Sequence, residues 1–308
     1  MQILGFFVLC VIWGTTWLAI KISLEGLPPF LGAGIRFCVA LTALFFFVRN
    51  KRMSRGIRRA DLFLLTVSAI LLYGFDYGLI YWGEQYIGAG VAAIFFATFV
   101  LFTCIWTNFL FRSETFRWKT FVGLVIGFCG IVIVFYDQLE RTHFSRMVLL
   151  ASAAVILSAA CGAMSLVIVK KYLSKMDPYA LTFYQMGIGV FLLLLTGFLL
   201  EHPGDIRINV RVGLSVLYLG IVGSAFAFVI YYRLLQEMSA ITLSLIIYIT
   251  PLFALVADYV AFHEQIPFRS IAGMAVIFLG AGLTQKKTIK IVSIPIRRNK
   301  RPTADLSP

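Results

Sequence analysis

The sequence predicts an all-α integral membrane protein with ten transmembrane helices, arranged as two inverted five-helix repeats. The chain contains ten mainly apolar runs, each close to the roughly twenty residues that a helix needs to cross the hydrocarbon core. Its composition agrees, because 60% of the residues are hydrophobic, 13% are charged and the mean hydropathy is +0.92. Soluble domains lie far from these values. In addition, landmarks of the first half return in the same order in the second half.

The ten runs are joined by short links that leave no room for a soluble domain. The first run lacks a basic n-region, and Lys21 and Glu25 follow it where a secretory signal would have a small-residue cleavage site, so we treat it as a span. The expected units are a first five-helix repeat over 1–137, a second over 147–286 and a basic tail over 287–308. In chain order, the predicted spans cover residues 3–20, 30–48, 62–82, 88–111, 118–136, 148–169, 179–200, 212–235, 240–262 and 270–284.

Positive charge is concentrated on alternate links of the chain. Twenty of the 27 lysines and arginines follow even-numbered spans or lie in the tail, within 49–59, 112–119, 170–175 and 286–301 and at Arg233. The positive-inside rule then places both termini in the cytoplasm, which requires an even number of spans. This topology explains the formal net charge of +13, so no nucleic-acid partner is expected. The predicted location is the cell inner membrane, with the lipid bilayer around the protein.

Landmark residues define the repeat. Pro29 opens the second span and Pro178 opens the seventh, while Arg36 corresponds to Gln185. Because a five-helix unit ends on the membrane side opposite to its start, two tandem copies must be inverted relative to each other. Inverted repeats are typical of alternating-access carriers, whose site lies near the midplane at the repeat interface. The further pairs are Tyr81 with Tyr232, Ala89 with Ala240, Gly14 with Gly162, Lys21 with Lys170, Gly123 with Gly273 and Gly130 with Gly280.

Several short motifs stand at the starts, centres and ends of the spans. They are Trp13-Gly14, Pro29-Phe30, Pro178-Tyr179, Tyr81-Trp82-Gly83-Glu84-Gln85, Pro251-Leu252-Phe253 and the equal spacings from Glu114 to Gly123 and from Glu264 to Gly273. In these motifs the chain resembles the EamA-type branch of the drug/metabolite transporter superfamily, over nearly its whole length except the tail. The resemblance implies a carrier in which spans one to four and six to nine surround a central cavity, with spans five and ten at the periphery. One departure is the fourth span, which has Phe99-Val100 where the ninth has Pro251.

Three ionisable residues, Arg36, Asp76 and Asp258, stand inside predicted spans. Each costs on the order of 3 kcal/mol on insertion scales, so such residues usually face a cavity or a partner. Glu84 lies further along the face of Asp76. We expect Arg36 to bind a substrate carboxylate or a gating carboxylate, and Asp76 or Glu84 to take up a proton or a cationic group. The structural alternative is an internal Arg–Asp ion pair that only fixes helix packing.

Aromatic residues at membrane depth form a second set of candidate cavity-lining side chains. Trp and Tyr away from the interfacial belt favour a cavity wall, where both the ring and its polar tip are used. Pro251 interrupts the hydrogen-bond ladder of its helix and frees a carbonyl, so a gate is expected there, with simple helix bending as the alternative. The aromatic candidates are Trp13, Trp17, Tyr73, Tyr77, Tyr184, Tyr231 and Tyr248.

Glycine steps mark the fifth and tenth spans and let helices approach closely. They are expected to support packing within the monomer, with a homodimer as the alternative. The five cysteines lie within spans without metal-ligand spacing, and we expect them to be apolar packing residues. No metal or cofactor is expected. The steps run through Gly123, Gly127 and Gly130 and from Gly273 to Gly280.

Together these features predict a secondary active transporter that moves a small organic metabolite, such as an amino acid, an amine or a related compound. Export is the preferred direction and protons are the candidate coupling ion. The alternative is a membrane-embedded receptor or enzyme without transport activity. No enzymatic activity is expected, because the histidines at 143, 202 and 263 lie near span ends and do not form a protease-like pair. A G-x-x-x-x-G-K-[ST] loop for ATP is also missing from the sequence.

Overall fold

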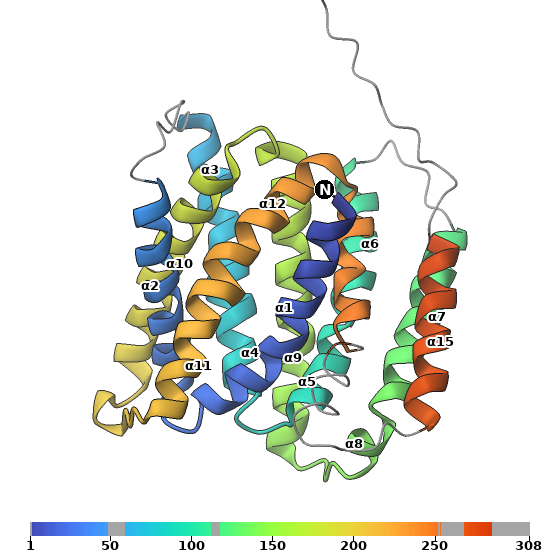
Figure 1. The fold of residues 1–308 in the computed structure, drawn as a ribbon, viewed down its shortest axis with the longest axis horizontal. Coiled ribbons are helices and arrows are strands. Elements are labelled where there is room, and N and C mark those ends of the chain that lie inside the picture. The colour runs from blue at the N-terminus through green and yellow to red at the C-terminus, as the bar shows by residue number, and fades with distance from the viewer. Residues whose placement is uncertain (1, 49–58, 112–117, 252, 254–267, 285–308) are drawn as a thin grey trace, which may run out of the picture.

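The computed structural model describes residues 2–48, 59–111, 118–251, 253 and 268–284, and the secondary structure within these residues is helical (Figure 1). Seven of the described helices are long and apolar enough to cross a membrane, and three shorter apolar helices accompany them. The predicted all-α membrane protein is confirmed at this level. The seven long segments are Gln2–Ser23, Pro29–Phe46, Asp61–Gly83, Ala89–Phe111, Arg146–Leu173, Pro178–Leu200 and Val210–Glu237; the shorter ones are Trp118–Val134, Ala240–Pro251 and Phe268–Thr284.

Several of the long segments are built from two or three consecutive elements. The first half contains α1 (Gln2–Ser23), α2 (Pro29–Val48), α3 (Arg59–Ala69), the π-helical η1 (Ile70–Tyr77), α4 (Gly78–Gly83), α5 (Ala89–Phe96), α6 (Thr98–Phe111), α7 (Trp118–Val134) and α8 (Tyr136–Glu140). The second half contains α9 (Arg146–Ile168), the π-helical η2 (Val169–Leu173), α10 (Pro178–Leu200), the 3₁₀ turn η3 (Pro203–Asp205), α11 (Val210–Gly220), the π-helical η4 (Ile221–Phe226), α12 (Ala227–Glu237), α13 (Ala240–Ser244) and α15 (Phe268–Thr284).

The bundle has two ends, which we name after the elements that mark them in Figure 1. The N-terminus and α3 lie at the α3 end, and α8 lies at the α8 end. Helix α1 runs from the α3 end to the α8 end, and α9 runs the opposite way. The C-terminal ends of η2 and α12, which carry Lys170, Lys171 and Arg233, lie at the α3 end. The C-terminal end of α1, which carries Lys21, lies at the α8 end.

Helices α2 and α10 pack against each other and share a capping interaction. The carboxylate of Glu201, at the end of α10, accepts hydrogen bonds of 2.9 Å from the backbone amides of Phe30 and Leu31 in the first turn of α2. These amides have no partner within their own helix, and a negative charge is favoured at a helix N-terminus. The end of one span therefore fixes the start of another.

Two pairs of described segments contain similar interruptions. The segments Asp61–Gly83 and Val210–Glu237 each contain a π-helical stretch, η1 in the first and η4 in the second. The α-helix of the fourth span breaks at Ala97, and that of the ninth span breaks at Leu245. The missing proline at Phe99-Val100 therefore does not prevent a matching break. In the ninth span the break precedes Pro251 and so does not lie at the proline itself.

Helices α7 and α15 form a close pair at one side of the bundle (Figure 1). A Cβ atom added at Gly123 would lie 2.8 Å from the carbonyl oxygen of Gly280, and one added at Gly273 would lie 2.8 Å from that of Gly130. Real Cβ atoms essentially never approach so closely, so the backbones of the two helices touch because these positions are glycine. The predicted glycine steps are thus used within one chain.

Candidate functional site

A cavity lies between helices of both halves. Its walls come from α1, α2, η1, α4, α5 and α6 of the first half, and from α9, α12, α13 and the helical turns up to Thr250 of the second. Of the described residues, those of α7, α10 and α15 do not line it. Helices α7 and α15, which the family resemblance expects at the periphery, therefore do not line the cavity, and neither does α10, which the resemblance expects at its wall.

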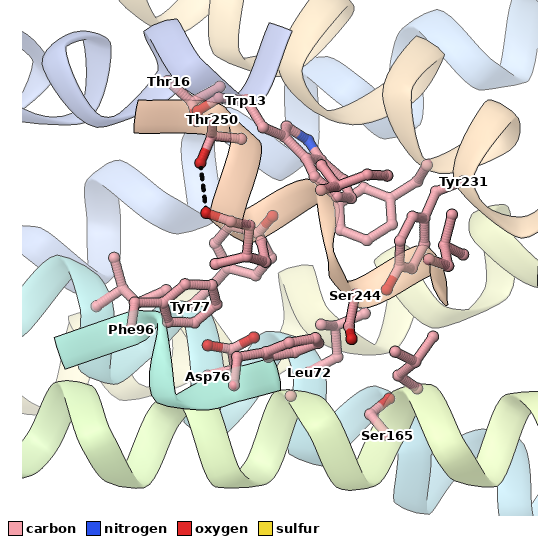
Figure 2. Close-up of a pocket in the computed structure, with 18 of the residues that line it drawn as sticks. Trp13, Thr16, Leu72, Asp76, Tyr77, Phe96, Ser165, Tyr231, Ser244 and Thr250 are labelled. Atoms are coloured by element: carbon pink, nitrogen blue, oxygen red, sulfur yellow. Dashed lines mark hydrogen bonds between the residues drawn. The ribbon is translucent and has the colours of Figure 1, made fainter. Parts of the chain in front are cut away.

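Six of the predicted candidates meet at this cavity: Trp13, Trp17, Arg36, Asp76, Tyr77 and Tyr231. Figure 2 shows Trp13 and Tyr231 on one side of the space, with Asp76 and Ser165 opposite them. The indole ring of Trp13 packs on Tyr231 with ring centroids 5.0 Å apart. Trp17 packs on Phe96 at 5.4 Å, so aromatic rings from four spans form much of the wall.

Arg36 is 1% exposed, and groups of the second half orient its guanidinium. Its Nε atom donates a hydrogen bond of 2.9 Å to Ser224 Oγ, and Nη2 donates one of 3.5 Å to the carbonyl of Gly223. Its Cζ atom also lies 4.9 Å from the centre of the Tyr77 ring, in cation–π geometry. The remaining nitrogen, Nη1, is buried without a hydrogen-bond partner among the described residues. One donor nitrogen of a permanently charged group is therefore unused.

The π-helical segment η4 supplies the acceptor for two of these side chains. The Gly223 carbonyl accepts from Arg36 Nη2 and, at 3.3 Å, from Trp13 Nε1. A π-helical segment departs from the i→i−4 hydrogen-bond ladder, and such segments are frequent at functional sites. Here the distortion presents a backbone oxygen to side chains from α1 and α2. The irregular backbone lines a cavity, which is the place where membrane proteins tolerate it.

Asp76 is 3% exposed and lies on η1 beside the cavity. Its Oδ1 atom is buried and accepts no hydrogen bond from the described residues. Gly162 on α9 makes room for the carboxyl group, because a Cβ added there would lie 2.9 Å from Asp76 Cγ and 3.1 Å from the ring of Phe99. Only a residue without a side chain fits at this point. Gly162 was a repeat landmark in the sequence, and the space it leaves for Asp76 explains why glycine stands there.

The ion pair considered between Arg36 and Asp76 is not formed in this structure. Among the residues that the structure describes, the salt bridges are Arg211 with Glu25 at 3.4 Å and Arg269 with Asp137 at 2.7 Å. These two pairs are solvent-exposed. Arg36 and Asp76 therefore line the same cavity as separate ionisable groups.

The other predicted residues lie outside the cavity lining. Tyr73 is fully buried behind the wall, with its ring 4.8 Å from that of Phe37. Tyr184 is half-buried and packs on Phe183. The Tyr248 hydroxyl donates a hydrogen bond of 2.9 Å to the Leu124 carbonyl, so this side chain faces α7.

Glu84, Pro251 and Asp258 complete the set of predicted residues. Glu84 is fully buried near the α8 end, at the end of α4. Asp258 lies outside the described residues. Pro251 has no N–H for the carbonyl of Ile247, and the hydroxyl of Thr250 donates to that oxygen at 3.0 Å (Figure 2). The freed carbonyl thus gains a substitute donor at the cavity wall.

Several wall residues were not among the predicted sites. In α12, Phe228 and Tyr232 line the cavity beside Tyr231, which was itself an aromatic candidate. Their spacing of three and four residues places them on one helical face, and that aromatic face is the signal that was available. The hydroxyls of Ser244 and Thr250 gave no comparable signal, because Ser and Thr are common inside membrane helices, where they bond to their own backbone.

A fully paired polar chain closes one side of the cavity. The hydroxyl of Tyr232 donates to Gln185 Oε1 at 2.5 Å, and Gln185 Nε2 donates to Ser68 Oγ at 2.6 Å. Ser165 Oγ donates to the Ser68 carbonyl at 2.8 Å. These groups come from α12, α10, α3 and α9. Satisfied buried networks rigidify the elements that they join, so this side of the cavity is held by neutral groups.

The model of the EamA-like transporter family matches residues 1–136 and 149–285. The chain is 25% identical over 278 residues to the "Uncharacterized transporter YoaV" of Bacillus subtilis, covering 90% of this chain and 94% of that protein. It is 24% identical over 298 residues to the "Probable amino-acid metabolite efflux pump" of Salmonella typhimurium, covering 94% and 95%. A crystal structure with 17% identity superposes with a TM-score of 0.77, covering 92% of this chain and 96% of that chain, which supports the fold alone.

Proposed function

Because the two matched stretches span most of the chain, the protein belongs to the EamA-like transporter family, and we propose that it is a secondary active transporter of a small organic metabolite. The family and the relatives make it a multi-pass membrane transporter of the drug/metabolite type and not an enzyme. The observation that carries the finer proposal is the cavity between the two halves. It contains one cation and one carboxyl group, each with an unused hydrogen-bonding atom.

The proposed architecture has ten spans in two inverted five-helix repeats, over 1–137 and 147–286, followed by a basic tail over 287–308. The seven long helices and the three shorter ones together give ten segments. Matching π-helical segments in η1 and η4 support the repeat, and so do the matching breaks at Ala97 and Leu245. Alternating access would then move one repeat against the other around a fixed site.

The proposed substrate has charged groups and an apolar part. Arg36 would bind a carboxylate through its unused nitrogen, and Asp76 would bind a cationic group. The rings of Trp13, Trp17 and Tyr77 would cover the apolar part. An amino acid, an amine or a related compound has this chemistry, and the name of the Salmonella relative supports the choice. Export is the proposed direction for the same reason.

The remaining expected residues have supporting roles in this proposal. Tyr73 backs the wall, and Pro251 bends the helix at a gate whose freed carbonyl is held by Thr250. Tyr184, Tyr248 and Asp258 stay candidates that act at some other stage of the transport cycle. Protons are the proposed coupling ion. A homodimer is not required, because the α7–α15 contact uses the glycine steps and the cavity is complete in one chain.

The α3 end is proposed to face the cytoplasm of a cell with this protein in its inner membrane, because helices that end there, such as α12, precede links that the sequence predicts on the basic side. Both termini are then cytoplasmic. A reporter fused after residue 308 should therefore be active if it needs the cytoplasm. Activity of a periplasmic phosphatase at that position would contradict the orientation.

A metabolite comparison tests the proposed function. Excreted and retained compounds would be compared in cells that make the wild-type protein or Arg36→Ala at equal levels in the membrane. A transporter predicts at least one small compound whose distribution changes only with the wild-type protein, and whose flux into vesicles saturates with concentration. Equal metabolite profiles, or chemical conversion of the compound, would support the receptor or enzyme alternative instead.

A further inference from the structure

Two lysines hold equivalent helix ends at opposite sides of the molecule. Lys21, near the end of α1, donates hydrogen bonds to the backbone carbonyls of Glu84 at 2.6 Å and Ile87 at 3.3 Å. Lys170, near the end of the sixth span, donates to the backbone carbonyl of Leu235 at 2.7 Å. We call these contacts the Lys21 latch and the Lys170 latch. Each places a cation on the free carbonyls at a helix C-terminus, where positive charge is favoured.

The two latches correspond position by position in the proposed repeat. Lys21 pairs with Lys170, and Glu84 lies three residues after Tyr81 just as Leu235 lies three residues after Tyr232. The Lys21 latch lies at the α8 end, and the Lys170 latch lies at the α3 end. The acceptor in both is a backbone oxygen, so the side chain at the acceptor position plays no part in either hydrogen bond.

The latches differ in that side chain. Leu235 is 1% exposed, and Glu84 in the equivalent place is 0% exposed. Neither carboxylate oxygen of Glu84 accepts a hydrogen bond from any residue in the described part of the chain. Because the Lys170 latch forms with a leucine, a latch of this kind does not need a carboxyl group. The carboxyl group at Glu84 therefore requires another explanation.

The surroundings of Glu84 bear on its charge state. Lys21 of α1 and Arg36 of α2 are the cations that act on it, and the phenol of Tyr81 lies on its own helix. Helix α9 packs against α4 and presents Ala151 and Val155 beside Gly83. None of the described cations pairs with the Glu84 carboxylate, since the ammonium of Lys21 is bound to carbonyl oxygens. An ionised carboxylate without a partner is strongly disfavoured in such a place.

We propose that Glu84 is a proton-binding site that controls the Lys21 latch. With the proton bound, the carboxyl group is neutral and Lys21 holds the end of α4, as in this structure. When the proton leaves to water at the α8 end, the carboxylate attracts the Lys21 ammonium away from the two carbonyls and the latch opens. The Lys170 latch has no such group and does not respond to protons. Asp76, which lines the cavity, is thereby left for the substrate.

The proposal fixes the direction in which the Lys21 latch responds to pH. The latch is closed at low pH, where Glu84 keeps its proton, and it opens as the pH at the α8 end rises. Only the use of this switch in transport depends on the proposed function. In an exporter, a proton taken up from outside would close the outer end before the cavity turns inward, and exchange for substrate then requires that this proton leave to the inner side.

A cysteine placed beside the latch reports its opening. Ser23 lies two residues after Lys21 and is 1% exposed, so Ser23→Cys is a small change at a buried position. The full-length protein in sealed vesicles would be treated with a membrane-impermeant thiosulfonate, and labelling of the natural cysteines would be measured in protein without the reporter. Rates would be compared between variants at the same pH, because the reactivity of the thiol itself then cancels.

Three variants test whether Glu84 is the group that opens the latch. With Glu84 present, labelling should rise by up to about tenfold per pH unit relative to Glu84→Gln, as release of one proton requires. Glu84→Leu copies the Lys170 latch and should stay closed like Glu84→Gln. Glu25→Gln is the matched control, because Glu25 lies at the same end but is exposed and paired with Arg211 at 3.4 Å. It should keep the full pH dependence.

One result would overturn the proton site: a ratio of labelling rates, with Glu84 present over Glu84→Gln, that does not change with pH. Infrared spectroscopy gives a second measurement on the unmodified chain, which should show the band of a protonated carboxyl group that disappears as pH rises and is missing in Glu84→Gln. Neither measurement needs a substrate. If the latch titrates but no metabolite moves, the proton site stands and the transport proposal fails.

Discussion

The Nε atom of Arg36 donates a hydrogen bond of 2.9 Å to the hydroxyl of Ser224, so the buried cation of the first half is oriented by a residue of the second half. The cavity therefore depends on both halves for its electrostatics as well as its shape. Since Nη1 has no partner among the described residues, Ser224 fixes the guanidinium while one donor stays available.

Substitutions at Arg36 should separate charge from geometry. Arg36→Ala should abolish transport while the protein still reaches the membrane, and Arg36→Lys should lose most activity, because lysine keeps the charge but not the planar fork. Ser224→Ala should weaken substrate binding by about five- to tenfold, the effect of one hydrogen bond of about 1 kcal/mol. Saturation kinetics in vesicles would measure these effects. Normal flux in well-expressed Arg36→Ala protein would refute the site.

Gly162→Ala should impair transport without unfolding the protein. The added methyl group would press on Asp76 Cγ at 2.9 Å and on Phe99 at 3.1 Å. Alanine is by about 1 kcal/mol the better helix former, so helix propensity cannot explain a loss. Gly187→Ala is the matched control, since nothing lies within 4 Å of the added atom. Equal transport by the two variants would show that Asp76 does not need the space.

Gly280→Val should destabilise the protein rather than alter its substrate affinity. The α7–α15 backbones touch at this glycine, and overpacking of a close contact typically costs about 1–3 kcal/mol. Thermal unfolding in detergent should detect the loss. Gly282→Val on the same helix has open space and serves as the control. If the control is destabilised equally, β-branching in the helix and not the contact is the cause.

A paired substitution tests the freed carbonyl in the ninth span. Thr250→Val removes the donor to the Ile247 oxygen and should cost about 1–3 kcal/mol if that oxygen is left buried and unpaired. Pro251→Ala restores a backbone N–H that can reach the same carbonyl. The double variant should therefore recover the stability lost in Thr250→Val, measured by thermal unfolding. Strictly additive losses would show that the hydroxyl has another role.

Much of the architecture was predictable because membrane spans and their links differ sharply in composition. The face that each helix turns toward the cavity was harder to predict. Lipid is as apolar as a protein core, so hydrophobicity does not distinguish a lipid-facing side from a buried one. Tyr231 and Tyr248 are equally plausible wall residues by composition, yet only Tyr231 lines the cavity, while Tyr248 bonds to α7. The rotation of each helix is decided by its neighbours.

The hydrogen-bond partners of buried polar residues could not be predicted from the sequence either. The chain from Tyr232 through Gln185 to Ser68 joins three segments that are far apart in the sequence. Each residue alone gives no sign of the others. By contrast, Arg36 and Asp76 could be identified singly, because the cost of placing an ionisable group in a span makes each one informative without knowledge of its neighbours.

The close pairing of α7 with α15 has a consequence for how the protein is assembled. Chains are made from the N-terminus, so α7 enters the membrane well before α15 has been synthesised. Its glycine-lined surface must meanwhile face lipid. This exposure is tolerable, because lipid is as apolar as the partner helix and exposed glycine carries no large penalty in the bilayer. Completion of the first half therefore waits for the last described helix. A ribosome-bound chain that stops before α15 should hold α7 loosely, whatever the state of the other helices.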